Sequence, residues 1–342
     1  MKKIVTFGEV MLRLKAPGHE RLFQSPCLEA RFGGGEANVA ASLALFGQEA
    51  LFVTALSADP VGRAALQTLR GLGVDTRAVR FTEGRTGIYF LETGADQRPS
   101  QVVYDRAGSA AALVKPGDFD WAELFRDAHW FHFSGITPAL SRSAADACRE
   151  AVRAARAAGV KVSIDLNYRR KLWNYGIPAP EVMRELAAGA DLLIANEEDI
   201  QLSLGLAADA DPGRSRVSAE AYRALAARTR EQFPNLEGVA ITLRESLSAD
   251  RNGWSAVLDG RSGFHVSRKY ALEDIIDRVG GGDAFAAGLI FGLLEYGDEA
   301  RALEYAVAAA ALKHTIPGDL NLATRPEVER LAAGDGTGRV LR

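Results

Sequence analysis

The sequence has few of the features that define secreted, disulfide-bonded or membrane proteins. Only two cysteines, Cys27 and Cys148, occur in 342 residues, which argues against a disulfide framework and indicates a reducing compartment. No apolar run approaches the roughly 20 residues of a membrane-spanning helix. The N-terminal stretch MKKIVTFGEV is too short an apolar run for a signal peptide. We therefore expect a cytoplasmic protein.

The sequence also lacks a strong charge of either sign and two common nucleotide-binding motifs. Its formal net charge is −3, which gives no reason to expect nucleic acid or an anionic membrane as a partner. It contains no G-x-x-x-x-G-K-[ST] motif, and GGGEANVA at residues 33–40 lacks the G-x-G-x-x-G spacing. A P-loop enzyme is therefore excluded, and a Rossmann dehydrogenase is disfavoured.

Short apolar runs alternate along the chain with alanine-rich amphipathic segments. This alternation predicts an α/β fold with a mostly parallel central sheet flanked by helices. The predicted strands are Ile4–Val10, Ala50–Ala55, His129–Ser134, Val160–Leu166, Leu192–Ala195 and Val239–Thr242. The predicted helices are Ala37–Phe46, Val61–Leu69, Ser141–Ala158, Ala219–Glu231, Asp283–Glu295 and Ala300–Leu312.

Two regions instead alternate polar and apolar residues, as strands with one exposed face do. Thr86–Thr93 and Gln101–Arg106 have the pattern of a hairpin, and Met11–Lys15 and Cys27–Phe32 are also strand-like. We interpret them as a small β-sheet that forms a lid. The lid would be built from about residues 11–32 and 86–106 of a single domain that covers residues 1–342.

Polar residues follow several predicted strands at the point where each strand ends, which is where open parallel sheets bind ligands. Any one of them could be an ordinary loop or helix-capping residue, but together they favour a binding site at this edge of the sheet. They include Asn167, Arg169, Asn196, Asp199, Thr242 and Arg244.

Three consecutive glycines precede Asp283 and an apolar, helix-like run in DRVGGGDAFAAG, residues 277–288. Free amides at a helix N-terminus bind anions, and glycines let a phosphate approach them closely. Asp283 could simply cap the helix, but a cap does not call for three glycines. We expect the helix dipole to lower the pKa of Asp283, which phosphoryl transfer tolerates because positioning and charge stabilisation carry that reaction. The motif therefore favours phosphoryl transfer.

Together, GGGEANVA and DRVGGGDAFAAG resemble the motifs of the ribokinase-like (PfkB-type) carbohydrate kinases, and NEED at 196–199 resembles their Asn-x-x-Glu motif. The resemblance covers nearly the whole chain and implies a ribokinase-like fold with a small β lid over the sugar. Within the family, SGITPALS, DLNYRRKLW and YDRAGSA are most similar to 2-keto-3-deoxygluconate kinases. The implied reaction is phosphorylation of the 6-hydroxyl of 2-keto-3-deoxygluconate by ATP with Mg²⁺.

The resemblance also implies roles for residues by their positions. Catalytic roles are implied for Asp283 and for the amides of Gly280, Gly281 and Gly282. Sugar contacts are implied for Gly34, Gly35, Asn38, Tyr89, Tyr104, Arg106, Ile136 and Arg169. Nucleotide contacts are implied for Asn167, Asn196, Thr242 and Arg244, and a position near Mg²⁺, through water, for Asn196 and Asp199. A homodimer joined through the lid is also implied.

Four residues depart from the family pattern. Glu36 stands where the family prefers a small residue or proline, although the acid-sugar kinases accept Glu. Arg278 replaces a small residue, Gly281 replaces an alanine, and Asp199 replaces a glutamate that is one methylene longer. The TLRES stretch at 242–246 also differs from the glycine-containing nucleotide turn of the family.

Two arginines support an acid sugar as the substrate. Period two places Tyr104 and Arg106 on one face of their strand, and Arg106 and Arg169 could hold a carboxylate bidentately. Neutral sugars would not need two guanidinium groups, although either arginine could be a surface ion-pair residue. The open alternatives are a kinase for a neutral sugar, such as fructose or ribose, and a sugar-binding sensor without turnover.

Overall fold

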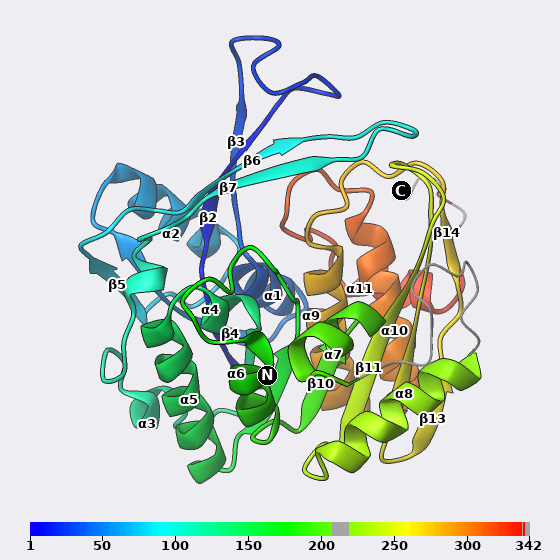
Figure 1. Ribbon diagram of the computed structural model, residues 1–342. Helices are drawn as coiled ribbons and strands as arrows, with labels where there is room; N and C mark the ends of the chain where they lie inside the picture. The colour runs from blue at the N-terminus through cyan, green and yellow to red at the C-terminus, as the bar shows by residue number, and fades with distance from the viewer. Residues whose placement is uncertain (207–218, 337, 339–342) are drawn as a thin grey trace.

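The chain forms a ten-stranded sheet and a separate four-stranded sheet, as the computed structural model shows for residues 1–206, 219–336 and 338 (Figure 1). The strand order of the large sheet is β13-β12-β11-β10-β9-β8-β1-β4-β5, and β14 pairs with β12. Its strands are β1 (Lys3–Phe7), β4 (Glu49–Ser57), β5 (Val79–Thr82), β8 (Trp130–Ser134), β9 (Lys161–Asp165), β10 (Leu192–Ala195), β11 (Gly238–Ser246), β12 (Asn252–Gly260), β13 (Gly263–Val266) and β14 (Tyr270–Leu272).

The neighbouring strands in the order β11-β10-β9-β8-β1-β4-β5 pair in parallel. Strand β12 pairs antiparallel with β11, β13 and β14. Every residue of β1, β8 and β10 is buried. Strands covered on both faces must be apolar almost throughout, which is why continuous apolar runs predict them. The expected α/β fold with a mostly parallel sheet is confirmed.

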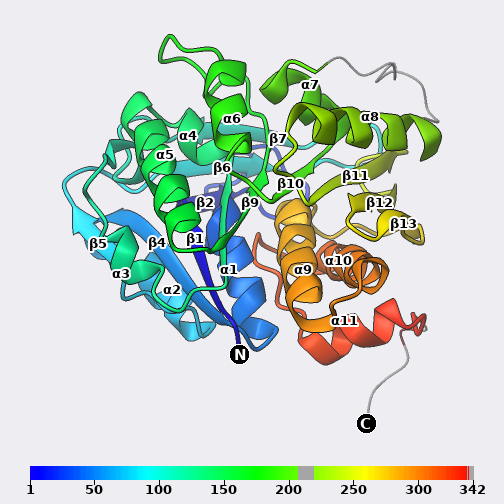
Figure 2. The same ribbon diagram turned by 90° about the horizontal axis from the view of Figure 1, so that it is seen from below.

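Helices cover both faces of the large sheet, as Figure 2 shows from below. One face packs in a core with α3 (Trp121–Leu124), α5 (Arg142–Ala157), α6 (Ala179–Ala187), α7 (Glu197–Leu204) and α8 (Ala219–Gln232). The other face packs with α1 (Gly35–Leu45), α2 (Pro60–Gly71), α9 (Gly281–Tyr296), α10 (Glu299–Lys313) and α11 (Arg325–Ala332). Two short helical turns, η1 (Ala111–Leu113) and α4 (Ile136–Ala139), complete the fold.

Helices α9 and α10 pack unusually closely because α9 carries glycines on the shared face. A Cβ added at Gly288 would lie 2.8 Å from the Cα of Ala306, and one at Gly292 would lie 2.6 Å from the Cα of Ala302. The close approach brings the C-terminal end of α10 beneath the start of α9. Among the described residues, no helix is both long and apolar enough to cross a membrane.

The small sheet contains β2 (Met11–Lys15), β3 (Glu29–Gly33), β6 (Ile88–Glu92) and β7 (Gln101–Asp105), in the order β3-β2-β6-β7. It lies above the large sheet in Figure 1. Strands β6 and β7 form the predicted antiparallel hairpin, whereas β2 and β6 pair in parallel. The alternation of polar and apolar residues therefore predicts the strands and the hairpin, but not the parallel pairing of β2 with β6.

Candidate active site

A cavity of about 430 Å³ lies where the small sheet faces the carboxyl ends of the strands of the large sheet. Met11, Tyr89 and Tyr104 of the small sheet line it, and so do residues that follow β9, β10 and β1. Sixteen of the seventeen residues implied by the family resemblance lie on its wall, and only Gly281 does not. Those sixteen are Gly34, Gly35, Asn38, Tyr89, Tyr104, Arg106, Ile136, Asn167, Arg169, Asn196, Asp199, Thr242, Arg244, Gly280, Gly282 and Asp283.

The three glycines before Asp283 serve three different purposes. Gly280 has a φ of 85°, in the left-handed region, and a Cβ there would collide with the carbonyl oxygen of Asp319. A Cβ on Gly281 would lie 2.6 Å from the ring of His314. At Gly282, by contrast, no atom lies within 4 Å of an added Cβ. Backbone conformation and packing therefore explain the first two glycines, whereas the third leaves open space beside the cavity.

One of the expected anion-binding amides is already in use. The N–H of Gly281 donates to the carbonyl of Arg278 at 3.3 Å, which closes the turn that enters α9. The N–H groups of Gly280, Gly282 and Asp283 have no acceptor in the described part of the chain. The free amides at this helix N-terminus are therefore those of residues 280, 282 and 283, not of the three glycines.

Asp283 is the third residue of α9 and does not cap it, because Gly280 occupies the N-cap position without a side-chain bond. Its Oδ2 accepts a hydrogen bond of 2.7 Å from Nδ2 of Asn38. Asp283 is half-buried and lines the cavity. Burial raises its pKa to about 6, although the Asn38 hydrogen bond acts in the opposite direction. The expectation that the helix dipole lowers this pKa is therefore wrong, because desolvation is the larger effect.

Asn38 joins the two glycine motifs at the start of α1. Its Oδ1 accepts the N–H of Gly34 at 3.2 Å, while its Nδ2 reaches Asp283. Nearby, a Cβ on Gly35 would lie 3.7 Å from Oδ1 of Asp283. The GGGEANVA motif thus holds the Asp283 carboxylate as well as lining the cavity.

Glu36 has an anchoring role that accounts for its departure from the family pattern. It is buried, and its Oε1 accepts hydrogen bonds from the Ser134 backbone at 2.9 Å, the Ser134 hydroxyl at 2.8 Å and the Thr137 hydroxyl at 2.6 Å. Burial raises its pKa in spite of these donors. Glu36 therefore fixes the turn between β8 and α4 that carries Ile136.

The two arginines expected to hold a carboxylate have different surroundings. Arg106 is buried and paired with buried Glu9, a residue that the sequence patterns did not single out. Within this pair, Nε of Arg106 and Oε1 of Glu9 have no hydrogen-bond partner among the described residues. Arg169 is exposed, and among the described residues its Nη1 donates to the carbonyl of Tyr168 at 3.1 Å. Its positive charge opposes the rise that burial causes in the pKa values of the cavity carboxylates Asp165, Asp199 and Asp283.

Two buried carboxylates, Asp165 and Asp199, also line the cavity. Burial, Asp199 and Asp283 raise the pKa of Asp165 well above its usual range, and burial raises that of Asp199. Asn196 caps α7, because its Oδ1 accepts the Asp199 N–H at 2.8 Å. No group of three His, Cys, Asp or Glu side chains suited to a metal occurs in the described residues.

The remaining polar wall is formed by residues after β9, within β11 and after β14. Asn167 adopts a φ of 34°, which is rare outside glycine. Thr242 donates to the Ala195 carbonyl at 3.4 Å, and the Arg244 guanidinium lies 5.1 Å from the centre of the Trp254 ring. Arg278 donates to the carbonyls of Ser248 and Ala249. Arg278 therefore ties the turn before α9 to the loop after β11.

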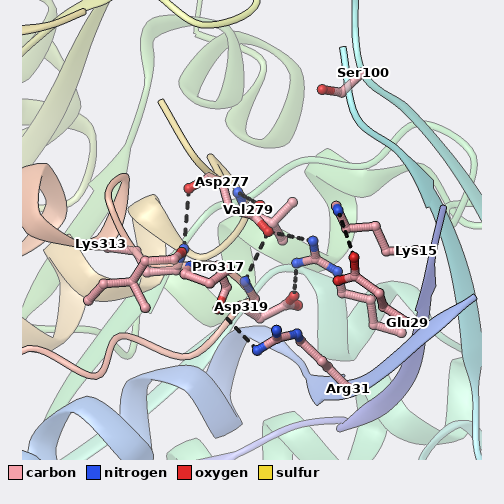
Figure 3. Close-up of polar contacts among 12 residues, drawn as sticks. Lys15, Glu29, Arg31, Ser100, Asp277, Val279, Lys313, Pro317 and Asp319 are labelled. Carbon is pink, nitrogen blue, oxygen red and sulfur yellow. Dashed lines mark hydrogen bonds and ion pairs between the residues drawn. The ribbon is translucent and has the colours of Figure 1, made fainter. Parts of the chain in front are cut away.

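A buried network of ion pairs beneath the cavity escaped the sequence analysis. Arg13 of β2 is fully buried and pairs with Asp277 and, at 2.6 Å, with Asp319. The Tyr89 hydroxyl donates to Asp319 at 2.6 Å, so this group is engaged although its residue lines the cavity. Figure 3 shows Asp277, Asp319 and Lys313 close together. The small sheet is thereby joined to the segments before α9 and after α10.

Comparison with known proteins defines the class of this chain. Residues 1–324 match the pfkB family of carbohydrate kinases. The chain therefore belongs to that family, and it is a carbohydrate kinase with an alcohol group as the phosphoryl acceptor. The ribokinase-like fold that the motifs imply is confirmed.

Particular relatives are similar over almost their whole length. A crystal structure of 2-dehydro-3-deoxygluconokinase from Thermotoga maritima is 46% identical, with a TM-score of 0.92 and coverage of 98% of this chain and 100% of that one. The 2-dehydro-3-deoxygalactonokinase of Haloferax volcanii is 34% identical and covers 98% of each chain. The 2-dehydro-3-deoxygluconokinase of Thermoproteus tenax is 32% identical, over 97% of this chain and 94% of that one.

Proposed function

We propose that this kinase transfers the γ-phosphoryl group of ATP to the 6-hydroxyl of 2-keto-3-deoxygluconate. The observation that carries the proposal is the position of Asp283, whose carboxylate lies on the cavity wall beside the unpaired amides of residues 280, 282 and 283. A carboxylate next to an anion site can orient an alcohol toward a phosphoryl group held by those amides. The relatives named for 2-keto-3-deoxy sugar acids support this substrate.

In the proposed reaction, the sugar's O6 attacks the γ-phosphorus while the bond from that phosphorus to the ADP oxygen breaks. The hydroxyl proton moves to Asp283 as the new O–P bond forms. A pKa of about 6 leaves Asp283 mostly ionised at pH 7. The free amides at the N-terminus of α9 face the negative charge of the phosphoryl group.

Recognition of the sugar acid falls mainly to Arg169 in this proposal. Among the described residues, the Arg169 side chain donates to the Tyr168 carbonyl and to no carboxylate, so its guanidinium group can bind the carboxylate of a sugar acid. Arg106 lines the same cavity, although Glu9 already neutralises its charge. Tyr104, whose ring lies 5.5 Å from the Arg106 guanidinium, completes this wall.

ATP and Mg²⁺ fit the part of the cavity formed by residues of β11 and residues that follow β9 and β10. We assign the nucleotide to the wall formed by Asn167, Asn196, Thr242 and Arg244. Asp199, with neighbouring Asp165, offers carboxylate oxygens whose raised pKa values would fall beside a divalent cation. Bound Mg²⁺ would neutralise phosphate charge, held largely by phosphates and waters because the described chain offers no three-ligand site.

A substrate panel tests the proposal. ADP release is measured with ATP, Mg²⁺ and 2-keto-3-deoxygluconate, 2-keto-3-deoxygalactonate, fructose or ribose, and phosphorus–proton NMR locates the new ester. We expect the highest kcat/KM with 2-keto-3-deoxygluconate and a phosphate on O6. Preference for fructose or ribose would contradict the acid-sugar assignment, and no ADP release with any sugar would favour a sensor.

The second candidate substrate is 2-keto-3-deoxygalactonate. The Haloferax volcanii relative, 34% identical over nearly the whole chain, carries the name of the galactonate-derived kinase. The two sugars have the same carboxylate and the same 6-hydroxyl. The ratio of their kcat/KM values in the panel therefore separates the two assignments without altering the roles of Asp283 and Arg169.

A further inference from the structure

Lys313, the last residue of α10, is fully buried beneath the turn that leads into α9. Its ammonium group donates to the carbonyl of Asp277 at 3.2 Å (Figure 3). It also donates to the carbonyl of Ile316 at 3.0 Å. One carbonyl precedes the glycine turn and the other lies in the segment that follows α10. The side chain thus bridges two backbone segments that meet under the candidate anion site.

A buried ammonium group costs free energy unless partners surround it. Burial lowers the pKa of Lys313 to about 8, while Asp277 and Asp319 oppose that shift. Arg13 adds a second cation to the same two carboxylates. Two cations and two carboxylates balance, so Lys313 stays charged at neutral pH in a place where an apolar side chain would be the ordinary choice.

The contacts of Lys313 define the shape of the glycine turn. A Cβ on Gly280 would lie 3.2 Å from Cε of Lys313, so the turn rests directly on the lysine side chain. The Asp277 carboxylate accepts the N–H groups of Val279 at 3.1 Å and Gly318 at 3.0 Å. Lys313 holds the backbone carbonyl of Asp277, while the side chain of Asp277 holds Val279 in the turn and Gly318 in the segment after α10.

We propose that Lys313 is a positioning residue for phosphoryl transfer, a built-in cation that keeps the amides of residues 280, 282 and 283 directed into the cavity. This inference rests on the sugar-kinase reaction and not on which sugar acid is the substrate. Lys313 acts through the turn and does not touch the substrate, since it does not line the cavity. Its positive charge under the turn also favours an anion above it.

The test compares Lys313→Ala, which leaves room for a small cation, with Lys313→Met, which fills that room without charge. Steady-state kinetics uses the best substrate of the panel, with and without methylammonium as the probe. Tetramethylammonium, which cannot donate a hydrogen bond, controls for ionic strength. Lys3→Met is the matched control, because buried Lys3 also donates to a backbone carbonyl, that of Arg126 at 2.7 Å. Lys3 lies at the amino end of β1, whereas the cavity lies at the carboxyl ends of the strands.

We expect both Lys313 variants to lose about 100-fold in kcat, the effect of misplacing anion-stabilising donors, with the KM for sugar changed little. Methylammonium should restore at least tenfold in Lys313→Ala and nothing in Lys313→Met, and Lys3→Met should keep the wild-type kcat. Hydrogen exchange in the free protein gives a second readout that needs no substrate. Amides 281 and 284, which are hydrogen-bonded to the carbonyls of Arg278 and Gly280, should exchange faster in Lys313→Ala and slow again with methylammonium.

Several results would overturn the inference. A wild-type kcat in Lys313→Met would show that the charge is dispensable. Loss of kcat in Lys313→Ala without faster exchange at amides 281 and 284, or without rescue by methylammonium, would show that the turn is held by other contacts. If neither variant folded, Lys313 would be needed for the stability of the fold and not for positioning the turn. If no sugar were phosphorylated by the wild type, the exchange result would still decide whether Lys313 holds the turn.

Discussion

At the scale of single residues, Asp283 illustrates how a tertiary environment determines acid–base chemistry. An aspartate in the first turn of a helix would by itself have a lowered pKa. Desolvation in the cavity outweighs the dipole here and raises the pKa to about 6. The result is a carboxylate close to its working pH, which suits a proton acceptor.

The raised pKa predicts the pH dependence of turnover. Asp283 must be unprotonated to accept the hydroxyl proton, so kcat/KM should rise about tenfold per pH unit below pH 6 and level off above it. Asn38→Ala removes the hydrogen bond that lowers this pKa, so the rise should move to higher pH. Rates measured from pH 5 to 8 check both curves. Identical pH curves for the wild type and Asn38→Ala would show that the titrating group is not Asp283.

The two cavity arginines should respond differently to removal. Arg169→Ala should raise the KM for the sugar acid far more than that for a neutral sugar, with no loss of thermal stability, because Arg169 is exposed. Arg106→Ala should raise the same KM and also destabilise the fold, since breaking a buried pair leaves Glu9 unpaired, at a cost of about 3–5 kcal/mol. Kinetics and thermal unfolding of both variants check this. Equal effects on acid and neutral sugars would contradict the carboxylate contact.

At the scale of elements, the N-terminus of α9 combines two glycines required by conformation and packing with one that leaves space. Gly282→Ala should fold normally, since an added Cβ meets no atom within 4 Å, yet lower kcat because the methyl group stands where the phosphoryl group approaches. Gly71→Ala in α2 is the control, as its Cβ also meets nothing. Kinetics and unfolding of the two variants should differ only in kcat. Full activity of Gly282→Ala would place the phosphoryl group elsewhere.

The sequence predicts most central elements but not their exact limits. The strand predicted at Ile4–Val10 ends at Phe7, and the helix predicted from Asp283 begins at Gly281. The apolar pattern continues past Phe7 although the strand ends there. At Gly281, the low helix propensity of glycine argues against a helix start that tertiary contacts nevertheless impose. The antiparallel strands β12, β13 and β14 were not predicted, because β13 and β14 have only four and three residues and β12 carries a glycine near each end.

At the scale of the whole molecule, long-range pairs are what local patterns cannot reveal. Arg13 meets residues 264 and 306 positions further along the chain. Nothing in the sequence around Met11–Lys15 marks that arginine as buried. The cavity residues were easier to predict, because strand ends of a parallel sheet converge and the two glycine motifs resemble a known family. Glu9 was missed although it follows an apolar strand directly.

The small sheet also predicts an assembly. We propose a homodimer joined through it, because β7 is an edge strand with exposed Val103 and Tyr104. Light scattering during size exclusion should give twice the chain mass. Val103→Asp should shift the protein toward monomer, whereas Leu113→Asp, an equally exposed apolar site outside the small sheet, should not. A monomeric wild type would contradict the proposal.

The kinetic behaviour of Asp283→Asn tests the central claim most directly. Asparagine keeps the size of the side chain and removes the base, so the variant should fold and bind the sugar acid as the wild type does. Its kcat should fall by roughly 10²–10⁴-fold, the usual contribution of a positioned acid or base. A folded Asp283→Asn variant with near-wild-type kcat would contradict the account.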